Sequence, residues 1–140
     1  MAKQLKRKEA REEAFRLLFE TEFQQDPDPV MIYGLAVKTR ELSDDAYVKD
    51  VYFGVREHLD EIDELFAKYA KGWKPERISP VSRSAVRLSI YEMLYREDVP
   101  NTVSINEAIE LVKKFDDPSA RAFVNGILNG VKDELLAKDS

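Results

Sequence analysis

The cations at the start of the chain are the residues whose type and spacing best suit a chemical role. The first eleven residues contain five cations and a single carboxylate, Glu9. The five cations are Lys3, Lys6, Arg7, Lys8 and Arg11. Lysine and arginine side chains gathered at one end of a chain can contact the phosphates of a nucleic acid. This segment is therefore a candidate RNA-binding arm.

Phenylalanine recurs on one flank of the helix that is predicted to follow this arm. Arg11, Phe15, Phe19 and Phe23 follow one another at steps of four, and Lys8 points in nearly the same direction as Phe19. Cations beside rings suit single-stranded RNA, because cations contact phosphates and unpaired bases stack on aromatic faces. The stripe also fits a wide core-facing surface with a solvated basic tail. The sequence leaves both interpretations open.

A second group of cations lies just before and inside the last predicted helix. Lys113, Lys114 and Arg121 are close in sequence and would add phosphate contacts if their loop faces the N-terminal arm. They fit equally well an ordinary solvated cluster that Asp116 and Asp117 balance. Both interpretations again stay open.

Phe123 stands apart from the apolar stripe of the last predicted helix. That stripe consists of Ala120, Val124, Ile127, Leu128, Val131 and Leu135. Phe123 lies about 90° from the centre of the stripe when residues are placed at helical spacing. We therefore expect Phe123 at the rim of the core.

Residue types that support catalysis are scarce. The chain has no cysteine, which excludes disulfides, thiolate nucleophiles and cysteine-based zinc sites, and its one histidine, His58, is interpreted as a surface or boundary residue. We find no Gly-rich phosphate loop and no GxSxG or HExxH motif. An all-α enzyme of the chorismate mutase type would need cations converging on an enclosed pocket, for which Arg83 and Arg87 are the candidates. We predict no catalytic residues, no metal site and no cofactor.

Proline positions and apolar spacing predict an all-α fold of about seven helices. Prolines follow Asp28, Lys74, Ser79 and Asp117, and proline is well tolerated at the first position of a helix. Between them apolar residues recur at threes and fours, the helical period. The predicted helices span residues 5–24, 29–41, 45–71, 80–96, 103–115 and 118–136, with a short turn at 75–78. An apolar stripe continues through the third segment, so a break near His58 stays open.

Two local side-chain interactions are also predicted. Ser104 and Glu107 have the spacing of a capping box, which starts or nearly starts a helix. Glu92 and Arg96 lie four residues apart, a spacing that allows an ion pair on one helix face. Both interactions would be structural.

The segment KGWKPERISP, residues 71–80, divides the chain into two groups of helices within a single compact domain. We expect an N-terminal subdomain of about 5–71 and a C-terminal subdomain of about 75–136, since neither half alone would bury a sizeable core. The net charge of −5 argues against indiscriminate binding to polyanions. The chain shows no apolar run of membrane-spanning length and no signal-peptide stretch, so we expect a cytoplasmic protein with no membrane association.

Three linked segments and the basic start resemble the NusB family of transcription antitermination factors. The segments are VRLSIYEML at 86–94, VSINEAIELVKKF at 103–115 and FVNGILNGV at 123–131. The basic opening helix of the family is similar to KRKEAREEAFRLLFE at 6–20. The resemblance spans nearly the whole chain, and it implies two packed three-helix bundles.

The resemblance further implies a protein that binds RNA and a partner without catalysis. Family members bind the boxA element of nascent ribosomal RNA together with the ribosomal protein NusE, and this helps RNA polymerase pass terminators. The basic arm then maps to the five N-terminal cations, the RNA-facing aromatics to Phe19, Tyr69 and Phe123, and the NusE-facing surface to positions near Glu76, Ser82 and Arg83. Some members form homodimers. A helical scaffold that binds protein only is the alternative, with an enzyme of the chorismate mutase type a third reading.

Overall fold

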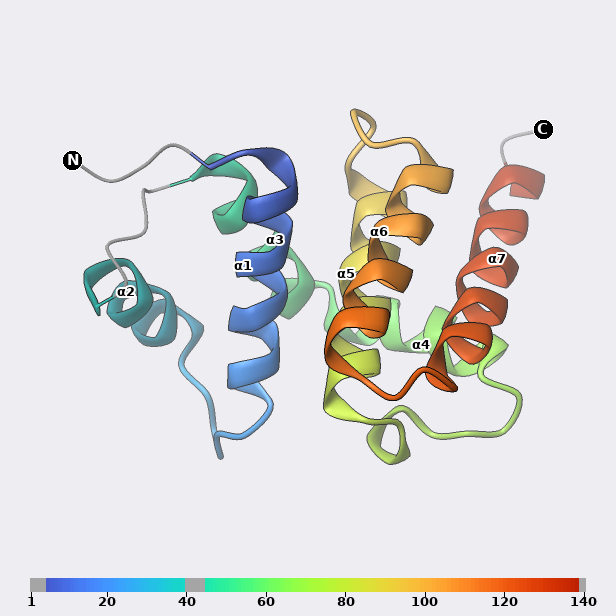
Figure 1. Ribbon diagram of the computed structural model, residues 1–140, viewed down its shortest axis with the longest axis horizontal. Coiled ribbons are helices and arrows are strands. Elements are labelled where there is room, and N and C mark those ends of the chain that lie inside the picture. The colour runs from blue at the N-terminus through green and yellow to red at the C-terminus, as the bar shows by residue number, and fades with distance from the viewer. Residues whose placement is uncertain (1–4, 40–44, 139–140) are drawn as a thin grey trace. The chain divides into compact units, whose positions relative to one another are not determined.

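The computed structural model describes residues 5–39 and 45–138, and all regular structure within them is helical (Figure 1). The α-helices are α1 Arg7–Thr21, α2 Pro29–Thr39, α3 Ala46–Glu57, α4 Leu59–Tyr69, α5 Pro80–Tyr95, α6 Asn101–Phe115 and α7 Ala120–Lys138, and a 3-10 turn, η1, covers Pro75–Arg77. The predicted all-α fold is confirmed. Pro29, Pro75 and Pro80 each begin a helical element, as their positions predicted.

Two compact units divide the chain at a helix break beside His58. His58 has φ −103° and ψ 24°, so α3 and α4 are separate helices. The first unit ends at Glu57 and holds α1 to α3, and the second begins at His58 and holds α4 to α7. This boundary lies earlier than the one predicted at 71–80, because α4 packs on α5 and α7 and buries Ile62 and Phe66 completely.

In the first unit α1 packs chiefly on α3, and α2 also contacts α1. The stripe of Ala14, Leu17 and Leu18 on α1 is buried, as its spacing predicted. The hydroxyls of Thr21 and Tyr52 lie 2.6 Å apart inside this unit and join the end of α1 to α3. The helix α1, whose first turn carries the basic arm, is therefore part of a packed three-helix group.

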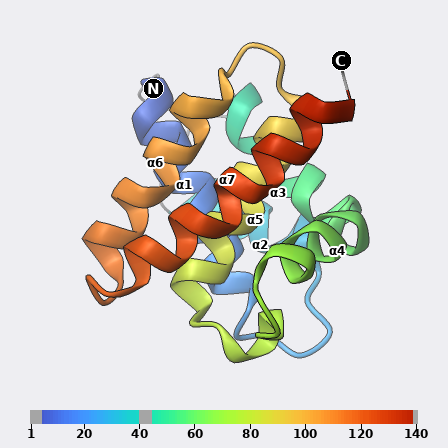
Figure 2. The ribbon, with the colours of Figure 1, turned by 90° about the vertical axis from the view of Figure 1, so that its right-hand side faces the viewer.

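In the second unit α5 is the central helix, contacted by α4, α6 and α7 (Figure 2). It buries Ala85, Val86, Leu88 and Ile90, among others, on several sides. The polar residues Ser82, Ser84, Ser89 and Glu92 are buried on it as well, so protein surrounds this helix on several sides. Packing on α5 therefore positions α4, α6 and α7, the helices that carry Tyr69, Lys113 and Phe123.

The capping box predicted at Ser104 is not what starts α6. The helix begins at Asn101, after Pro100, and Ser104 lies buried in its first turn. The Ser104 hydroxyl donates to Oε1 of Glu92 at 2.8 Å and lies 2.9 Å from the Ser89 hydroxyl. Ser104 is thus used to hold α6 against α5, a contact that no local spacing reveals.

Glu92 and Arg96, whose spacing allows an ion pair, lie in different environments. Glu92 is fully buried, and its carboxylate accepts the hydrogen bond from Ser104. The Arg96 guanidinium pairs with the carboxylate of Asp98 at 2.8 Å. The buried Glu92 therefore belongs to the polar contact between α5 and α6.

His58 is a half-buried boundary residue, as the sequence indicated. Its ring stacks on Tyr95 with centroids 4.4 Å apart. The Tyr95 hydroxyl donates to the Glu61 carboxylate at 2.8 Å. Within residues 5–39 and 45–138 we find no cluster of three residues able to hold a metal ion and no helix long and apolar enough to cross a membrane.

Candidate nucleic-acid interface

The basic arm lies at the start of α1, where its first described cations face solvent. Lys6, Arg7 and Lys8 are all exposed. The backbone N–H of Lys6 donates to the Glu9 carboxylate at 3.2 Å, which fixes the first turn. Lys3 lies outside the described residues. Three cations are therefore presented together on a helix end whose geometry is set locally.

Arg11 takes a different position from the rest of the arm. Only 4% of Arg11 is exposed, and its guanidinium carbon lies 5.7 Å from the centre of the Tyr47 ring. The exposed Arg7 lies over the same ring at 4.6 Å. Cation–π contacts of this kind hold a guanidinium against an aromatic face. Tyr47 of α3 therefore orients the base of the arm, and Arg11 is packed rather than solvent-facing.

The aromatic ladder of α1 runs from the core to the surface. Phe15 is 3% exposed and Phe23 is 66% exposed, while Phe19 between them is half-buried. The ring centroids lie 6.4 Å apart for Phe15 and Phe19 and 4.9 Å apart for Phe19 and Phe23. Each of the two interpretations of this stripe thus fits part of it, with Phe15 in the core and Phe19 and Phe23 toward solvent.

Tyr69, at the end of α4, is half-buried with its hydroxyl bonded to α7. The hydroxyl donates to the Glu134 carboxylate at 2.6 Å, and Lys68 forms an ion pair with the same carboxylate. These hydrogen bonds from Lys68 and Tyr69 lower the pKa of Glu134 to about 2. The hydrogen bond to Glu134 also raises the pKa of the Tyr69 hydroxyl. A ligand would therefore meet the ring of Tyr69 rather than a free hydroxyl.

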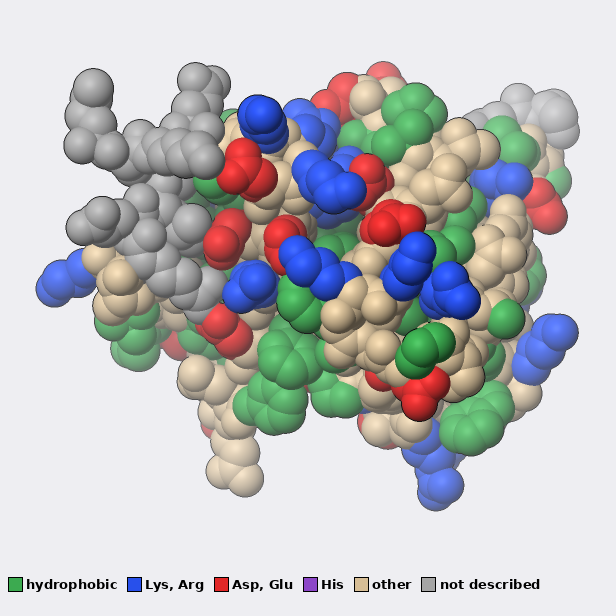
Figure 3. All heavy atoms as spheres, in the orientation of Figure 1, with side chains coloured by type: hydrophobic (Ala, Val, Ile, Leu, Met, Phe, Trp, Pro, Cys, Tyr) green, Lys and Arg blue, Asp and Glu red, His purple; other side chains and the backbone are tan. Residues whose placement is uncertain are grey.

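The second group of cations surrounds the loop between α6 and α7. Lys113 and Lys114 lie exposed in the last turn of α6, where positive charge is favoured by the helix dipole. The Lys114 ammonium lies 5.2 Å from the centre of the Phe115 ring. Arg121 is exposed, and its Nε donates to the Pro118 carbonyl at 3.4 Å. On the face shown in Figure 3, basic side chains lie over α1 and, in the second unit, over α6, with carboxylates among them.

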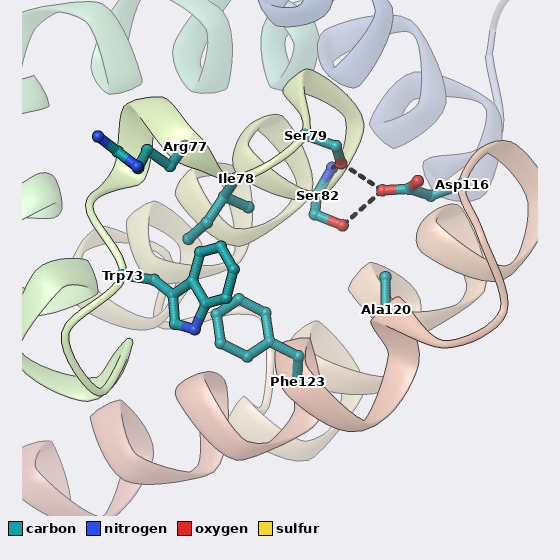
Figure 4. A pocket seen from close by; sticks show the side chains of 8 residues that line it. All are labelled: Trp73, Arg77, Ile78, Ser79, Ser82, Asp116, Ala120 and Phe123. Carbon is teal, nitrogen blue, oxygen red and sulfur yellow. Dashed lines mark hydrogen bonds between the residues drawn. The ribbon is translucent and has the colours of Figure 1, made fainter.

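Phe123 lines a pocket in the second unit, at the half-buried position that its place off the apolar stripe predicted. The pocket has a volume of about 260 Å³ and is lined by Trp73, Arg77, Ile78, Ser79, Ser82, Asp116, Ala120 and Phe123 (Figure 4). The rings of Trp73 and Phe123 meet edge to face with centroids 6.3 Å apart. One side of the pocket is therefore aromatic.

The polar side of the pocket is built around Asp116. Its carboxylate accepts hydrogen bonds from the hydroxyls of Ser79 and Ser82, the latter at 2.7 Å (Figure 4). It also accepts a hydrogen bond from the backbone N–H of Asp117 at 2.7 Å. Burial alone would raise the pKa of Asp116, but these hydrogen bonds outweigh it and hold the pKa below its ordinary 3.8. The pocket thus combines aromatic rings with an ionised carboxylate at neutral pH.

Known proteins match this chain over nearly its full length. The model of the NusB family matches residues 8–133. The chain belongs to the NusB family. The transcription antitermination protein NusB of Bacillus pumilus is 41% identical over 132 residues, which are 94% of this chain and 98% of that protein.

Solved NusB structures share the fold of this family member. T. maritima NusB superposes with a TM-score of 0.85 at 33% identity, and the match covers 94% of each chain. A crystal structure of the antitermination factors NusB and NusE in complex with double-stranded RNA contains a chain that superposes with a TM-score of 0.80 at 27% identity, covering 91% of this chain and 96% of that one.

The three residues predicted to face a protein partner are not equally exposed in this NusB-family chain. Glu76 is exposed on η1. Ser82 is 2% exposed, and its hydroxyl is bonded to Asp116, so its surface is limited to the wall of the pocket. Arg83 is half-buried and donates to the carbonyls of Pro75 and Ile78 at 3.0 and 2.9 Å. Ser82 and Arg83 therefore hold η1 and the start of α5 in place.

The two arginines offered for an enzyme of the chorismate mutase type do not converge. Arg83 is bonded to η1, and Arg87 forms a double hydrogen bond with Asp63 of α4, both distances being 2.8 Å. Neither side chain lines the aromatic pocket around Phe123. Their positions fit structural ties within the second unit rather than the binding of an anionic substrate.

Sequence reasoning missed Trp73 and the acceptor role of Asp116. Trp73 lies in the segment that we interpreted only as a run of helix breakers, and Asp116 was considered only as a counter-charge for nearby lysines. A signal for Trp73 was present, since a large aromatic residue stands among cations in a segment with no helical stripe. Nothing in the sequence indicates that Asp116 meets Ser79 and Ser82.

Proposed function

We propose that this NusB-family protein is a noncatalytic transcription antitermination factor. It binds the boxA element of nascent ribosomal RNA transcripts together with ribosomal protein NusE, in the cytoplasm, and helps RNA polymerase pass terminators. The observation that carries the proposal is the near full-length match to proteins named for transcription antitermination, one of whose relatives was solved with NusE and RNA. The function is binding, and no step of chemistry is assigned to any residue.

The proposed RNA-binding residues divide by physical role. Cations fix the phosphate backbone and aromatics engage bases. The cations are Lys3, Lys6, Arg7, Lys8, Arg11, Lys113, Lys114 and Arg121, and the aromatics are Phe19, Tyr69 and Phe123. The exposure of Lys6, Lys8 and Lys113 supports direct contact with phosphates. The buried Arg11 is proposed to stabilise the basic arm by packing beneath it. NusE is proposed to contact the region of Glu76, Ser82 and Arg83.

Fluorescence anisotropy of labelled boxA RNA tests this proposal directly. The chain is titrated into boxA RNA and into a scrambled RNA, with and without NusE, at several salt concentrations. We expect preference for boxA that NusE strengthens, and affinity that falls steeply with salt. For single strands the logarithmic slope changes by roughly 0.7 for each phosphate contact. Affinity that is flat across salt would contradict the role of the cations.

Replacing Lys6 and Lys8 together by alanine should reduce that salt slope by roughly 1.4, since two phosphate contacts are removed. Lys38→Ala is the matched control, because Lys38 is likewise exposed in the first unit and has no assigned contact. An unchanged slope in the double variant would remove the arm from the RNA surface.

Phe123→Ala should weaken boxA binding while leaving the fold intact. Phe123 is half-buried, so its truncation should cost less than the roughly 3–5 kcal/mol typical of a fully buried phenylalanine. Urea unfolding measures this cost, with Phe66→Ala, at a completely buried site, as the reference. A loss equal to that of the Phe66 variant would make Phe123 a core residue.

The alternative is a scaffold that binds protein only. It would bind NusE in a pull-down and show no affinity for either RNA, even in the complex. The exposed cations at the start of α1 favour RNA over this alternative, since lysine is depleted at the core of protein interfaces.

A further inference from the structure

The loop between α4 and α5 presents a tryptophan among three cations. Trp73 is 56% exposed, and Lys71, Lys74 and Arg77 are exposed around it. The chain turns sharply there, because Lys71 and Gly72 have φ values of 51° and 89°. The backbone N–H of Trp73 then donates to the Ala70 carbonyl at 3.1 Å, which fixes the turn after α4. This backbone turn therefore places the Trp73 side chain at the surface.

Trp73 lines two hollows of different character. One is the pocket that it shares with Phe123, and the second, of about 390 Å³, is lined by Lys71, Gly72, Trp73, Lys74 and Arg77. Figure 4 shows the indole beside the Phe123 ring, with the Arg77 guanidinium directed away from that ring. Phe123 thus contacts the indole in the first pocket, Arg77 lines both hollows, and Lys71 and Lys74 line only the second.

We infer that Trp73 is a stacking platform for an unpaired RNA base, and that Lys71, Lys74 and Arg77 contact the phosphates flanking that base. The inference rests on the proposed RNA-binding function and adds a site to it. A rigid indole offers a face to any base, and cations on flexible stems track the backbone. Glu76 is the only carboxylate within residues 71–77, so the loop carries three cations against one anion.

The composition of the loop favours RNA over a protein partner. Tryptophan and arginine are common at protein interfaces, but lysine is depleted there, and this loop presents two exposed lysines beside the ring. Apolar anchors in protein interfaces are usually surrounded by residues that exclude water, whereas the hollow beside Trp73 is bordered by charged side chains. RNA fits both the exposed cations and the exposed indole, because it carries phosphates and flat bases.

The sole tryptophan of the chain makes the inference directly measurable, because emission excited at a wavelength that the six tyrosines do not absorb reports on Trp73 alone. Unlabelled boxA RNA is titrated into the chain while emission is recorded, and binding is measured in parallel by anisotropy of labelled boxA RNA. We expect emission to be quenched along the same isotherm as the anisotropy. Bound RNA should also protect the indole from collisional quenching by acrylamide.

Variants then separate stacking from charge. Trp73→Ala should weaken RNA binding roughly 5- to 150-fold, the range for loss of one stacked base, while Trp73→Phe should retain most of the affinity. Lys71→Ala with Lys74→Ala should lower the salt slope by roughly 1.4. Leu136→Ala, which removes a side chain 54% exposed on α7, is the matched control for Trp73 and should leave affinity unchanged.

The outcomes distinguish this inference from the proposed function. RNA binding with unquenched emission and an unaffected Trp73→Ala variant would overturn the inference and leave the proposed function standing. No RNA binding by any form of the protein, with or without NusE, would overturn both. A Trp73→Ala variant that loses NusE binding but keeps RNA binding would make the loop a protein contact, which also overturns the inference.

Discussion

Gly130 is the residue whose missing side chain determines where a proposed RNA-facing ring lies. A Cβ atom at Gly130 would lie 2.4 Å from Cδ1 and 2.8 Å from Cγ of Tyr69, which is too close for the ring to remain in place. Because Gly130 leaves this room, Tyr69 reaches Glu134 one turn further along α7. The position of the Tyr69 ring therefore depends on the absence of a side chain at residue 130.

Gly130→Ala should destabilise the protein by about 1–3 kcal/mol, the usual cost of overpacking, because the Tyr69 ring must move near its root. Gly126→Ala on the same helix is the control. Nothing lies within 4 Å of a Cβ there, and alanine favours a helix, so stability should hold or rise. Urea denaturation of the two variants measures the difference, and equal stabilities would contradict the close packing.

Glu134 should make stability depend on acid. Its pKa is lowered from 4.5 to about 2 in the folded protein, so its contribution is present above the unfolded pKa and is lost as pH falls through the folded one. Wild type should therefore lose stability relative to Glu134→Gln between about pH 4.5 and 2. Thermal unfolding across this range measures the gap, with Glu110→Gln, exposed on α6, as control. A constant gap would show that the carboxylate is not stabilised by Lys68 and Tyr69.

At the scale of elements, Asp116 ties the loop after α6 to the beginning of α5. Ser79 is the N-cap of α5, and Ser82 lies in its first turn. One carboxylate at that position accepts from both hydroxyls and is favoured by the positive end of the helix dipole. The tie forms the polar wall of the pocket.

Asp116→Ala should cost about 1–2 kcal/mol, the range for losing a helix cap, because two hydroxyls and the Asp117 N–H lose their acceptor. Glu110→Ala, an exposed site on α6, should change stability by less than about 0.5 kcal/mol. Chemical denaturation compares them. A double-mutant cycle with Ser82→Ala should show coupling, and additive effects would mean that Ser82 does not depend on Asp116.

Local patterns predicted elements well where the determinant is local. Proline positions marked the starts of α2, η1 and α5, and the spacing of Leu17 and Leu18 marked the buried face of α1. They did not predict the role of Ser104, because its partner Glu92 comes from another helix. Nor did they indicate that α4 packs on α5 and α7, because those contacts also come from other helices.

At the scale of the whole molecule, a net charge of −5 coexists with local groups of exposed cations. Counting charge along the sequence located the arm, and helical spacing located Phe123 at a rim. The same methods could not separate the buried Arg11 from the exposed Lys8, or bring Trp73 together with Phe123, because those placements depend on side chains from different helices.

The helix break at His58 has a consequence for cooperativity. Trp73 lies in the second unit, so its emission follows that unit alone, whereas circular dichroism follows the helices of both. The first unit ends at Glu57, and a group of that size buries proportionately less surface. We expect the dichroism transition in urea to begin before the fluorescence transition. Coincident curves would show a single two-state unit. Separate transitions would show that the two units unfold independently, with His58, the one residue between α3 and α4, at their boundary.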